Sequence, residues 1–417
     1  MSQGEAIEPE PGRRRAATAF VLVTVTLDVL AMGIIGPVWP GLIKGFMHGD
    51  TVSAAAWFGV FATVFAAMQF FCSPLLGALS DRFGRRPVIL LSNFGLALDY
   101  LVMALAPAMG WLFVGRVLSG VTSAGYSTAY AYIADVTAPE KRAAAFGLIG
   151  AAFGIGFIFG PVLGGLLGQF NPRLPFWVAG GLSLLNGLYG LVVLPESLAR
   201  ANRSAFSLKR ANPVAALGLL RSQPQLLGLA SINFTTQLVH AVFSTVWVLY
   251  VAYRYHWTPL WVGISMGVVG VSSAVIQAVV VRFVVAKVGE RAAMVMGLFF
   301  GAAGFAIFAL ATEGWMFLVG IPILSLWGLT GPSVQALMSR SVGPTEQGKL
   351  QGANTSLSSV AGLIGPGLFS AVFAWALAHG EWHIPGAPFA LASAFMLGAM
   401  LTAWRVTARM ARKPQPA

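Results

Sequence analysis

Two aspartates differ from the other acidic residues because each lies deep inside a long apolar stretch. Asp28 follows "FVLVTVTL" and Asp99 follows "LSNFGLAL", whereas the other acids fall in tails, polar segments or at the ends of apolar stretches. A charge at the centre of a membrane-spanning helix costs about 2.5 to 3.5 kcal/mol on insertion scales, so such residues usually face a cavity and are functional. Both are candidates to carry a proton, with Arg116 as counter-charge. The alternatives are a structural carboxyl hydrogen-bonded within a helix bundle and, for Arg116, a side chain that extends to the membrane interface.

A second set of polar and aromatic side chains inside apolar stretches suggests a wide amphipathic pocket. Hydrogen bonding between helices is an equally good interpretation for any single amide in it, and a lone histidine in a span is more often structural. The predicted substrate cavity consists of Gln69, Asn93, Asn233, Gln237, His240, Trp247, Gln277, Gln335 and Asn354, with Trp327 nearby.

These side chains require membrane helices to position them. Of the 417 residues, 57% are hydrophobic and only 10% are charged, which excludes a soluble globular protein. A helix of roughly 20 apolar residues crosses the hydrocarbon layer. The sequence predicts an all-α membrane protein with twelve such stretches, at 17–39, 52–79, 87–107, 110–134, 143–168, 174–194, 224–250, 259–285, 292–312, 314–338, 350–378 and 386–406.

The net charge of +12 does not indicate nucleic-acid binding, because most Lys and Arg residues lie in short segments at alternate ends of the predicted helices. This pattern predicts that both termini are cytoplasmic. The first apolar stretch is too long for a cleaved signal sequence and predicts a retained span. The single cysteine, Cys72, excludes an intramolecular disulfide and a multi-cysteine metal site, and no metal is expected.

A shift of 205 residues aligns the two halves of the chain. It carries Gly84 to Gly289, Pro139 to Pro344, Gly147 to Gly352 and Gly160-Pro161 to Gly365-Pro366. Transporter folds are often built from such repeats. The sequence therefore predicts two pseudo-symmetric six-helix halves, residues 1–195 and 223–417, joined by a polar cytoplasmic linker at 196–222. The shift carries Asp28 to Asn233 and Asp99 to Gly304, so the second half is expected to have no buried acid.

The stretch "GALSDRFGRRPVIL", residues 77–90, concentrates charge between the second and third predicted spans. A basic loop that sets topology is one interpretation. Asp81, however, stands at the unfavourable end of the helix dipole, which implies a partner network. The stretch resembles the gating signature of the major facilitator superfamily, and the resemblance covers the whole chain. In that family the Asp and the later Arg, here Asp81 and Arg85, join an acid at the position of Asp135 to latch the halves in the outward-open state. The gating motif comprises Gly77, Asp81, Arg82, Gly84, Arg85, Arg86 and Asp135.

A second motif, "GIGFIFGPVLGG" at 154–165, resembles the signature of the antiporters of that superfamily, with Gly156, Gly160, Pro161, Gly164 and Gly165. The strings "LDVLAMGIIGPVWPGL", "LDYL", "GRVLSGVTSA" and "TVWVL" are similar to those of bacterial tetracycline/proton antiporters. Two positions depart from that group. Ser273 stands where its members carry a His, and Gly301 where they carry an Asp, which puts tetracycline itself in doubt as the substrate.

The resemblance implies a secondary active transporter that exports a hydrophobic or amphipathic drug, such as a tetracycline-like molecule, in exchange for protons. The proton gradient supplies the energy and no cofactor is expected. We expect a monomer in the bacterial inner membrane that does not bind nucleic acid. An uptake symporter of a sugar or small metabolite is the main alternative. An intramembrane hydrolase is a remote one, based on the GxSxG match "GISMG" around Ser265.

Overall fold

The computed structural model describes residues 11–123, 125–137, 142–200, 203, 220, 224–343, 346–379, 381 and 384–411. Pro139 and Pro344 of the repeat lie outside these ranges, as does most of the predicted linker. Helices dominate and no strand occurs among the described residues, as expected of a chain that must satisfy every backbone hydrogen bond inside a membrane. The predicted all-α class is confirmed.

The helical segments follow the apolar stretches closely. They are α1 (Pro11–Ile35), α2 (Trp39–Phe46), α3 (Thr51–Phe83), α4 (Arg85–Leu105), α5 (Met109–Thr122), α6 (Gly125–Val136), α7 (Arg142–Phe170), α8 (Leu174–Val193), α9 (Pro224–Thr245), α10 (Trp247–Tyr255), α11 (Pro259–Val275), the π-helical turn η5 (Ile276–Val280), α12 (Val281–Leu310), α13 (Gly314–Ser325), the 3₁₀ turn η6 (Leu326–Leu329), α14 (Thr330–Arg340), α15 (Gln347–Ala378) and α16 (Ala387–Ala411).

Ten helices of the described chain are long and apolar enough to cross a membrane. One of them, Pro259–Leu310, has 52 residues, which is about 78 Å of helix and far more than a single crossing needs. Its backbone leaves helical geometry at Gly289, with φ 77° and ψ 166°. If this segment makes two crossings that separate at Gly289, and α5 and α6 together make one interrupted crossing, the number of membrane crossings is twelve. The count of twelve stays a prediction.

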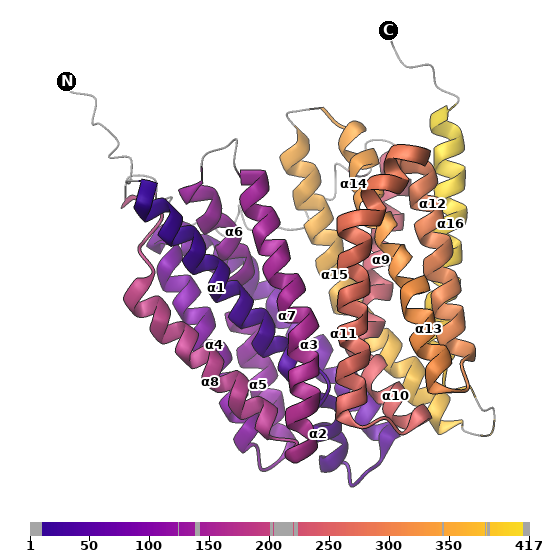
Figure 1. Ribbon diagram of the computed structural model, residues 1–417, viewed down its shortest axis with the longest axis horizontal. Helices are drawn as coiled ribbons and strands as arrows, with labels where there is room; N and C mark the ends of the chain where they lie inside the picture. Colours follow the sequence, from indigo (N-terminus) through magenta and orange to yellow (C-terminus); the bar gives the residue numbers. More distant parts are fainter. Residues whose placement is uncertain are drawn as a thin grey trace.

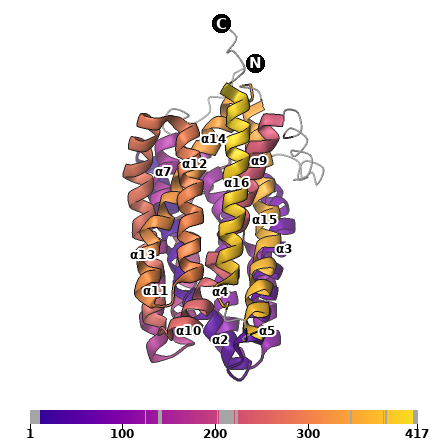
Figure 2. The ribbon, with the colours of Figure 1, turned by 90° about the vertical axis from the view of Figure 1, so that its right-hand side faces the viewer.

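The helices form two bundles side by side, α1–α8 and α9–α16, called here the N-terminal and C-terminal halves (Figure 1). Figure 2 shows the C-terminal half, in which α16 packs between α9 and α12. Equivalent glycines make equivalent contacts in the two halves. Gly160 of α7 packs against Leu30 and Gly33 of α1, and Gly365 of α15 packs against Leu238 and Ala241 of α9. The packing of the described helices thus follows the repeat in the sequence.

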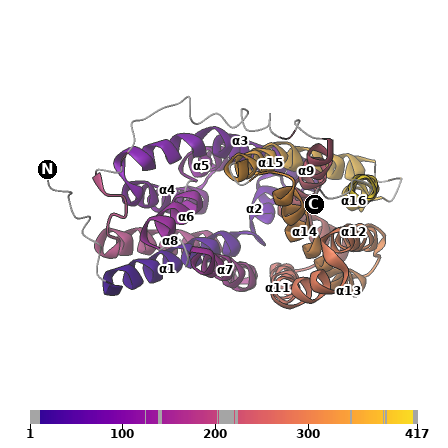
Figure 3. The same ribbon diagram turned by 90° about the horizontal axis from the view of Figure 1, so that it is seen from above.

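The halves meet mainly through two helix pairs, α7 with α11 and α3 with α15. A Cβ added at Gly165 of α7 would lie 2.4 Å from the carbonyl oxygen of Pro259, and one at Gly59 of α3 would lie 2.5 Å from Cβ of Ser370. All four residues belong to the ends of their helices that lie away from the chain termini. Toward the termini the two bundles splay apart (Figure 1), and Figure 3 shows this end from above. We call it the terminus-side end.

Candidate functional site

Asp28 of α1 faces α8, and the residue is 5% exposed. Its described partner is the amide of Asn186, which donates to Oδ1 at 2.9 Å and also to the carbonyl oxygen of Thr24 at 3.1 Å. Asn186 is completely buried. The carboxylate is therefore held by a neutral hydrogen-bond donor. Sequence reasoning missed Asn186, because an amide in a mid-membrane helix gives no signal that identifies its partner.

Asp99 forms the ion pair that the sequence led us to expect. The Arg116 guanidinium donates to Oδ2 of Asp99 at 2.8 Å, and the Asp99 side chain is fully buried. The same guanidinium lies 5.0 Å from the ring centroid of Trp39 and 5.7 Å from that of Phe65, within cation–π range. Arg116 is thus enclosed by an acid and two aromatic rings, which excludes the interpretation of a side chain extended to the membrane interface.

Several predicted cavity residues share one face of α9 and the helices beside it. Asn233, Gln237 and His240 recur at helical spacing. Asn233 approaches Asn354 of α15 at 3.4 Å, Asn354 donates to Gln335 of α14 at 3.0 Å, and Gln237 donates to a serine of α15 at 2.8 Å. Gln237 and His240 are nevertheless exposed, although they lie near the middle of the helix. This polar face is hydrogen-bonded within the C-terminal half and retains accessible side chains.

Trp247 and Asn93 do not line a cavity in this structure, contrary to the prediction. Trp247 is 1% exposed because its indole donates to the Ser265 hydroxyl at 3.1 Å and its ring packs edge-on against Phe317. Asn93 is completely buried in α4. Ser265 in turn donates to the carbonyl oxygen of Val262 at 2.7 Å. A serine held by these two hydrogen bonds is not an activated nucleophile, and the hydrolase alternative has no site here.

Gly301, one of the two departures, lies on a wall that contains Trp327. A Cβ added at Gly301 would lie 3.3 Å from Cγ of Trp327, so the indole covers this position. The Trp327 ring stacks on the Phe243 ring with centroids 6.2 Å apart. The centroid of the His240 ring lies 5.5 Å from that of Trp327. Trp327 belongs to η6, which contacts the π-helical turn through Gln277 and Gly328 at 3.4 Å. Where an acid is expected by resemblance, the chain presents an aromatic surface.

No group of three or more His, Cys, Asp or Glu side chains that could hold a metal ion occurs within the described ranges. Ser273, on α11, is partly buried and adds no side chain to such a group.

Gln69, a predicted cavity residue, lies in the N-terminal half and donates to the Ser123 hydroxyl at 2.9 Å.

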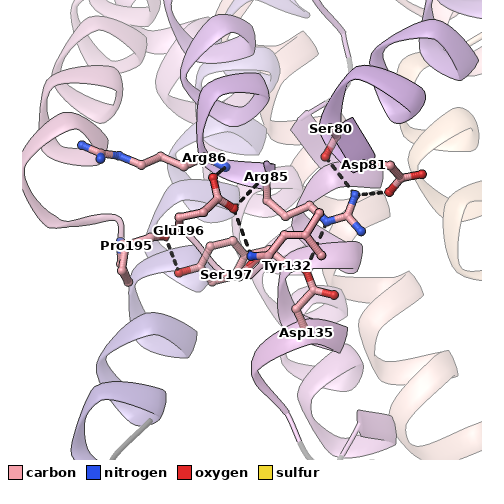
Figure 4. Close-up of polar contacts among 10 residues, drawn as sticks. Ser80, Asp81, Arg85, Arg86, Tyr132, Asp135, Pro195, Glu196 and Ser197 are labelled. Carbon is pink, nitrogen blue, oxygen red and sulfur yellow. Dashed lines mark hydrogen bonds and ion pairs between the residues drawn. The ribbon is translucent and has the colours of Figure 1, made fainter. Parts of the chain in front are cut away.

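The gating motif forms a charge network at the terminus-side end (Figure 4). The Arg85 guanidinium pairs with Asp81 and, at 3.1 Å, with Asp135. Asp81 lies in the last turn of α3, Arg85 begins α4 and Asp135 lies in the last turn of α6, so the network joins three helices of the N-terminal half. Gly84 has φ 112° and ψ 164°, a region that essentially only glycine adopts. At Gly77, also of the motif, no described atom of another element lies within 4 Å of an added Cβ.

The remaining arginines of the motif contact its immediate surroundings. Arg82 lies over the Phe83 ring at 5.2 Å, and Arg86 donates to the carbonyl oxygen of Leu191 at 2.7 Å. The contact with Leu191 ties the start of α4 to the end of α8.

Glu196 is a member of this network that the sequence did not reveal. Its carboxylate accepts from the backbone N–H groups of Arg85 at 2.8 Å and Arg86 at 3.3 Å, so it caps the N-terminus of α4. The neighbouring Ser197 hydroxyl donates to Asp135 at 3.1 Å, and the Tyr132 hydroxyl donates to the Pro195 carbonyl oxygen at 3.0 Å. Residues expected to begin a linker therefore form part of this charge network. The acid three residues past the end of α8 was the available signal.

The glycines of the second motif allow α7 to touch two neighbours. Gly156, Gly160 and Gly164 lie one turn apart, and a Cβ on each would come within 3 Å of α1 atoms, as close as 1.8 Å to the Ile34 carbonyl oxygen at Gly164. A Cβ at Gly263 of α11 would lie 2.2 Å from the carbonyl oxygen of Pro161. The motif thus fixes α7 against α1 and against α11 of the other half, as small residues do in membrane helices.

Comparison with known proteins agrees with this geometry. Residues 21–366 match the model of the Major Facilitator Superfamily. The chain is 39% identical to the tetracycline resistance protein, class C, of Escherichia coli, over 86% of this chain and 90% of that protein. It is 36% identical to the class B protein of the same organism, over 86% and 88%. The solved structure of the nucleoside transporter NupG shares the fold, with a TM-score of 0.75 at 13% identity over 95% of this chain and 100% of that one. The chain is therefore a membrane-embedded transporter of the Major Facilitator Superfamily, in the family of the tetracycline resistance proteins.

Proposed function

We propose that this protein exports a small drug-like molecule in exchange for protons, by alternating access between its two halves. The observation that carries the proposal is the ion pair between the fully buried Asp99 and Arg116, whose side chain is 11% exposed. A proton that binds Asp99 removes one charge of the pair and frees the guanidinium, so protonation changes the forces between α4 and α5. Asp28, held by the neutral amide of Asn186, is the second proton-binding group. Conformational coupling of this kind requires a group whose contacts depend on its protonation state.

The bundles rock about the helix pairs in which they already touch. α7 with α11 and α3 with α15 meet at the end away from the termini and splay at the terminus-side end. This arrangement suits the inward-facing state of a transporter whose terminus-side end is cytoplasmic. The opposite state would close that end and open the other.

The substrate is hydrophobic or amphipathic and carries a planar ring system. The relatives are named for resistance to tetracycline, which favours a molecule of similar size. Gly301 and Ser273 leave the C-terminal half without an acid or imidazole at those positions, and Trp327, Phe243 and His240 present ring faces instead. Amides of α9 and α15 supply polar contacts. Tetracycline itself is one candidate among such molecules.

The protein works without a cofactor, as a monomer in the bacterial inner membrane with both termini in the cytoplasm. The basic residues at the terminus-side end support this orientation. An uptake symporter would use the same fold, but the small-residue face of α7 and the named relatives favour export.

Expression in a bacterium that lacks its own efflux pumps tests the proposal. We expect raised inhibitory concentrations for tetracycline or another planar drug of a panel, and loss of the increase in Asp28→Asn and Asp99→Asn at equal membrane abundance. In inverted vesicles, addition of the drug is expected to release protons from the lumen. Unchanged resistance and proton release in both variants would refute the coupling, and accumulation of the drug by the cells would favour the uptake symporter.

A further inference from the structure

The C-terminal half contains an ion pair at the position of the Arg85–Asp135 pair, with the charges exchanged. Glu290 pairs with Arg340 at 2.5 Å. The 205-residue shift carries Arg85 to position 290 and Asp135 to position 340 (85 + 205 and 135 + 205). Each pair spans 50 residues of sequence. Where one half of the protein has a cation, the other half thus has an acid at the equivalent position of the repeat.

The local structure around the two pairs is also equivalent. Arg85 follows Gly84, with φ 112° and ψ 164°, and Glu290 follows Gly289, with φ 77° and ψ 166°. Asp135 lies in the last turn of α6, and Arg340 is the last residue of α14. The same turn is therefore preserved in both halves while the sign of each charge is reversed, which sequence comparison alone did not reveal.

The side chains of the pairs remain available for further contacts. Arg340 is 69% exposed as a side chain, and the Asp135 carboxylate is 22% exposed. Among ion pairs between described residues, none joins the two halves. Figure 3 shows α6 and α14 on opposite sides of the space between the bundles. A motion that closes the terminus-side end brings equivalent positions of these two helices toward each other.

We propose that Asp135 and Arg340 form an ion pair across the two halves when the terminus-side end closes. The four side chains then alternate in sign, in the order Arg85, Asp135, Arg340, Glu290, and every neighbour is of opposite charge. Had the repeat kept the same signs, two acids would meet and oppose closure. Arg340 and Glu290 are thus positioning residues for the gate. This inference rests on the alternating access proposed above.

The exchange variant Glu290→Arg with Arg340→Glu separates a gate from a local structural pair. It keeps the ion pair within the C-terminal half and the net charge of the protein, but it sets an acid at position 340 opposite Asp135. Arg340→Gln removes the attraction without adding repulsion. If the pair acts as a gate, closure is most complete in the wild type, less complete in Arg340→Gln and least complete in the exchange variant. Adding Asp135→Asn to the exchange variant is then expected to restore closure to the level of Arg340→Gln. A purely local pair predicts that the exchange variant resembles the wild type and that Arg340→Gln is the more impaired.

Closure is measured without knowledge of the substrate. Spin labels at Val192 of α8 and Phe283 of α12, which are 87% and 68% exposed, are introduced in a Cys72→Ser background. Distances are recorded in liposomes at acidic and alkaline pH. We expect a short-distance population in the wild type that is lost in the exchange variant. A wild type with the short distance and an exchange variant that keeps it would refute the ion pair alone. A wild type that never shows it would refute both the rocking of the halves and the ion pair.

Discussion

Arg116 of α5 donates to the buried carboxylate of Asp99 at 2.8 Å, and the pair lies in the interior of the N-terminal half. The guanidinium packs against the rings of Trp39 and Phe65. The Asp99 side chain is fully buried and that of Arg116 is 11% exposed, so solvent screens neither charge well and each depends on its partner. The pair is thus a structural element as well as a candidate for proton coupling.

Removal of one partner is expected to destabilise the protein more than removal of both. Asp99→Asn or Arg116→Gln leaves a buried charge without its partner, at a cost of about 3 to 5 kcal/mol. The double variant has two neutral amides and is expected to recover most of the melting temperature in detergent but none of the proton-coupled transport. A double variant no more stable than the worse single variant would contradict the role of the pair in stability.

Asn186 is expected to be required at the Asp28 site. Asn186→Leu removes the donor of the 2.9 Å hydrogen bond and leaves the carboxylate in an apolar contact. An unsatisfied buried group costs about 1 to 3 kcal/mol. We expect lower membrane abundance for Asn186→Leu, and recovery when Asp28→Asn is added. Immunoblots of membranes from the single and double variants make the comparison. An abundance that does not depend on residue 28 would show that Asn186 acts elsewhere.

The sequence indicated the buried acids and the gate because charge is conspicuous in an apolar chain. It led correctly to the pair of Asp99 and Arg116, since few counter-charges exist inside the membrane. It gave no means of locating Asn186 or Glu196, because hydrogen bonds between helices depend on how each helix is rotated about its axis. Trp247 was misassigned for the same reason: an indole in a span packs equally well in a core or in a cavity. The pairing of Glu290 with Arg340 was overlooked because comparison of residue identities does not recognise a reversal of charge.

The contact between α7 and α1 is expected to be intolerant of a single methyl group. A Cβ at Gly164 would lie 1.8 Å from the carbonyl oxygen of Ile34, whereas none of the described atoms lies within 4 Å of one at Gly154 of the same helix. Overpacking costs about 1 to 3 kcal/mol. We expect Gly164→Ala to lower the melting temperature and the resistance, and Gly154→Ala to behave as the wild type. Equal effects of the two substitutions would argue against close helix packing as the function of the motif.

Introduction of the missing acid at position 301 is expected to fail unless Trp327 is also changed. Gly301→Asp brings a carboxyl against the Trp327 indole, 3.3 Å from the new Cβ. We expect reduced abundance for Gly301→Asp and recovery for Gly301→Asp with Trp327→Ala, with Gly301→Ala as the smaller control. Resistance profiles on the drug panel show whether the double variant changes its substrate preference. Full abundance and unchanged resistance of Gly301→Asp alone would mean that the indole moves freely and does not define this wall.

The turn of the gate is expected to require glycine at position 84 for two separate reasons. Its backbone angles cost another residue about 1 to 3 kcal/mol. In addition, a Cβ there would lie 2.1 Å from Oε2 of Glu196, the carboxylate that caps α4. Gly84→Ala is therefore expected to abolish transport, and Gly77→Ala, whose new Cβ meets no described atom of another element, is expected to leave folding intact. The double variant Gly84→Ala with Glu196→Ala has no collision, but it keeps the backbone cost and lacks the carboxylate that caps α4. Only part of the stability lost in Gly84→Ala is therefore expected to return.

Melting temperatures of the wild type, Gly84→Ala, Gly77→Ala and the double variant separate the two causes. If the double variant recovers completely, the collision alone explains the glycine. If it recovers nothing, the backbone angles do, and the contact with Glu196 is incidental.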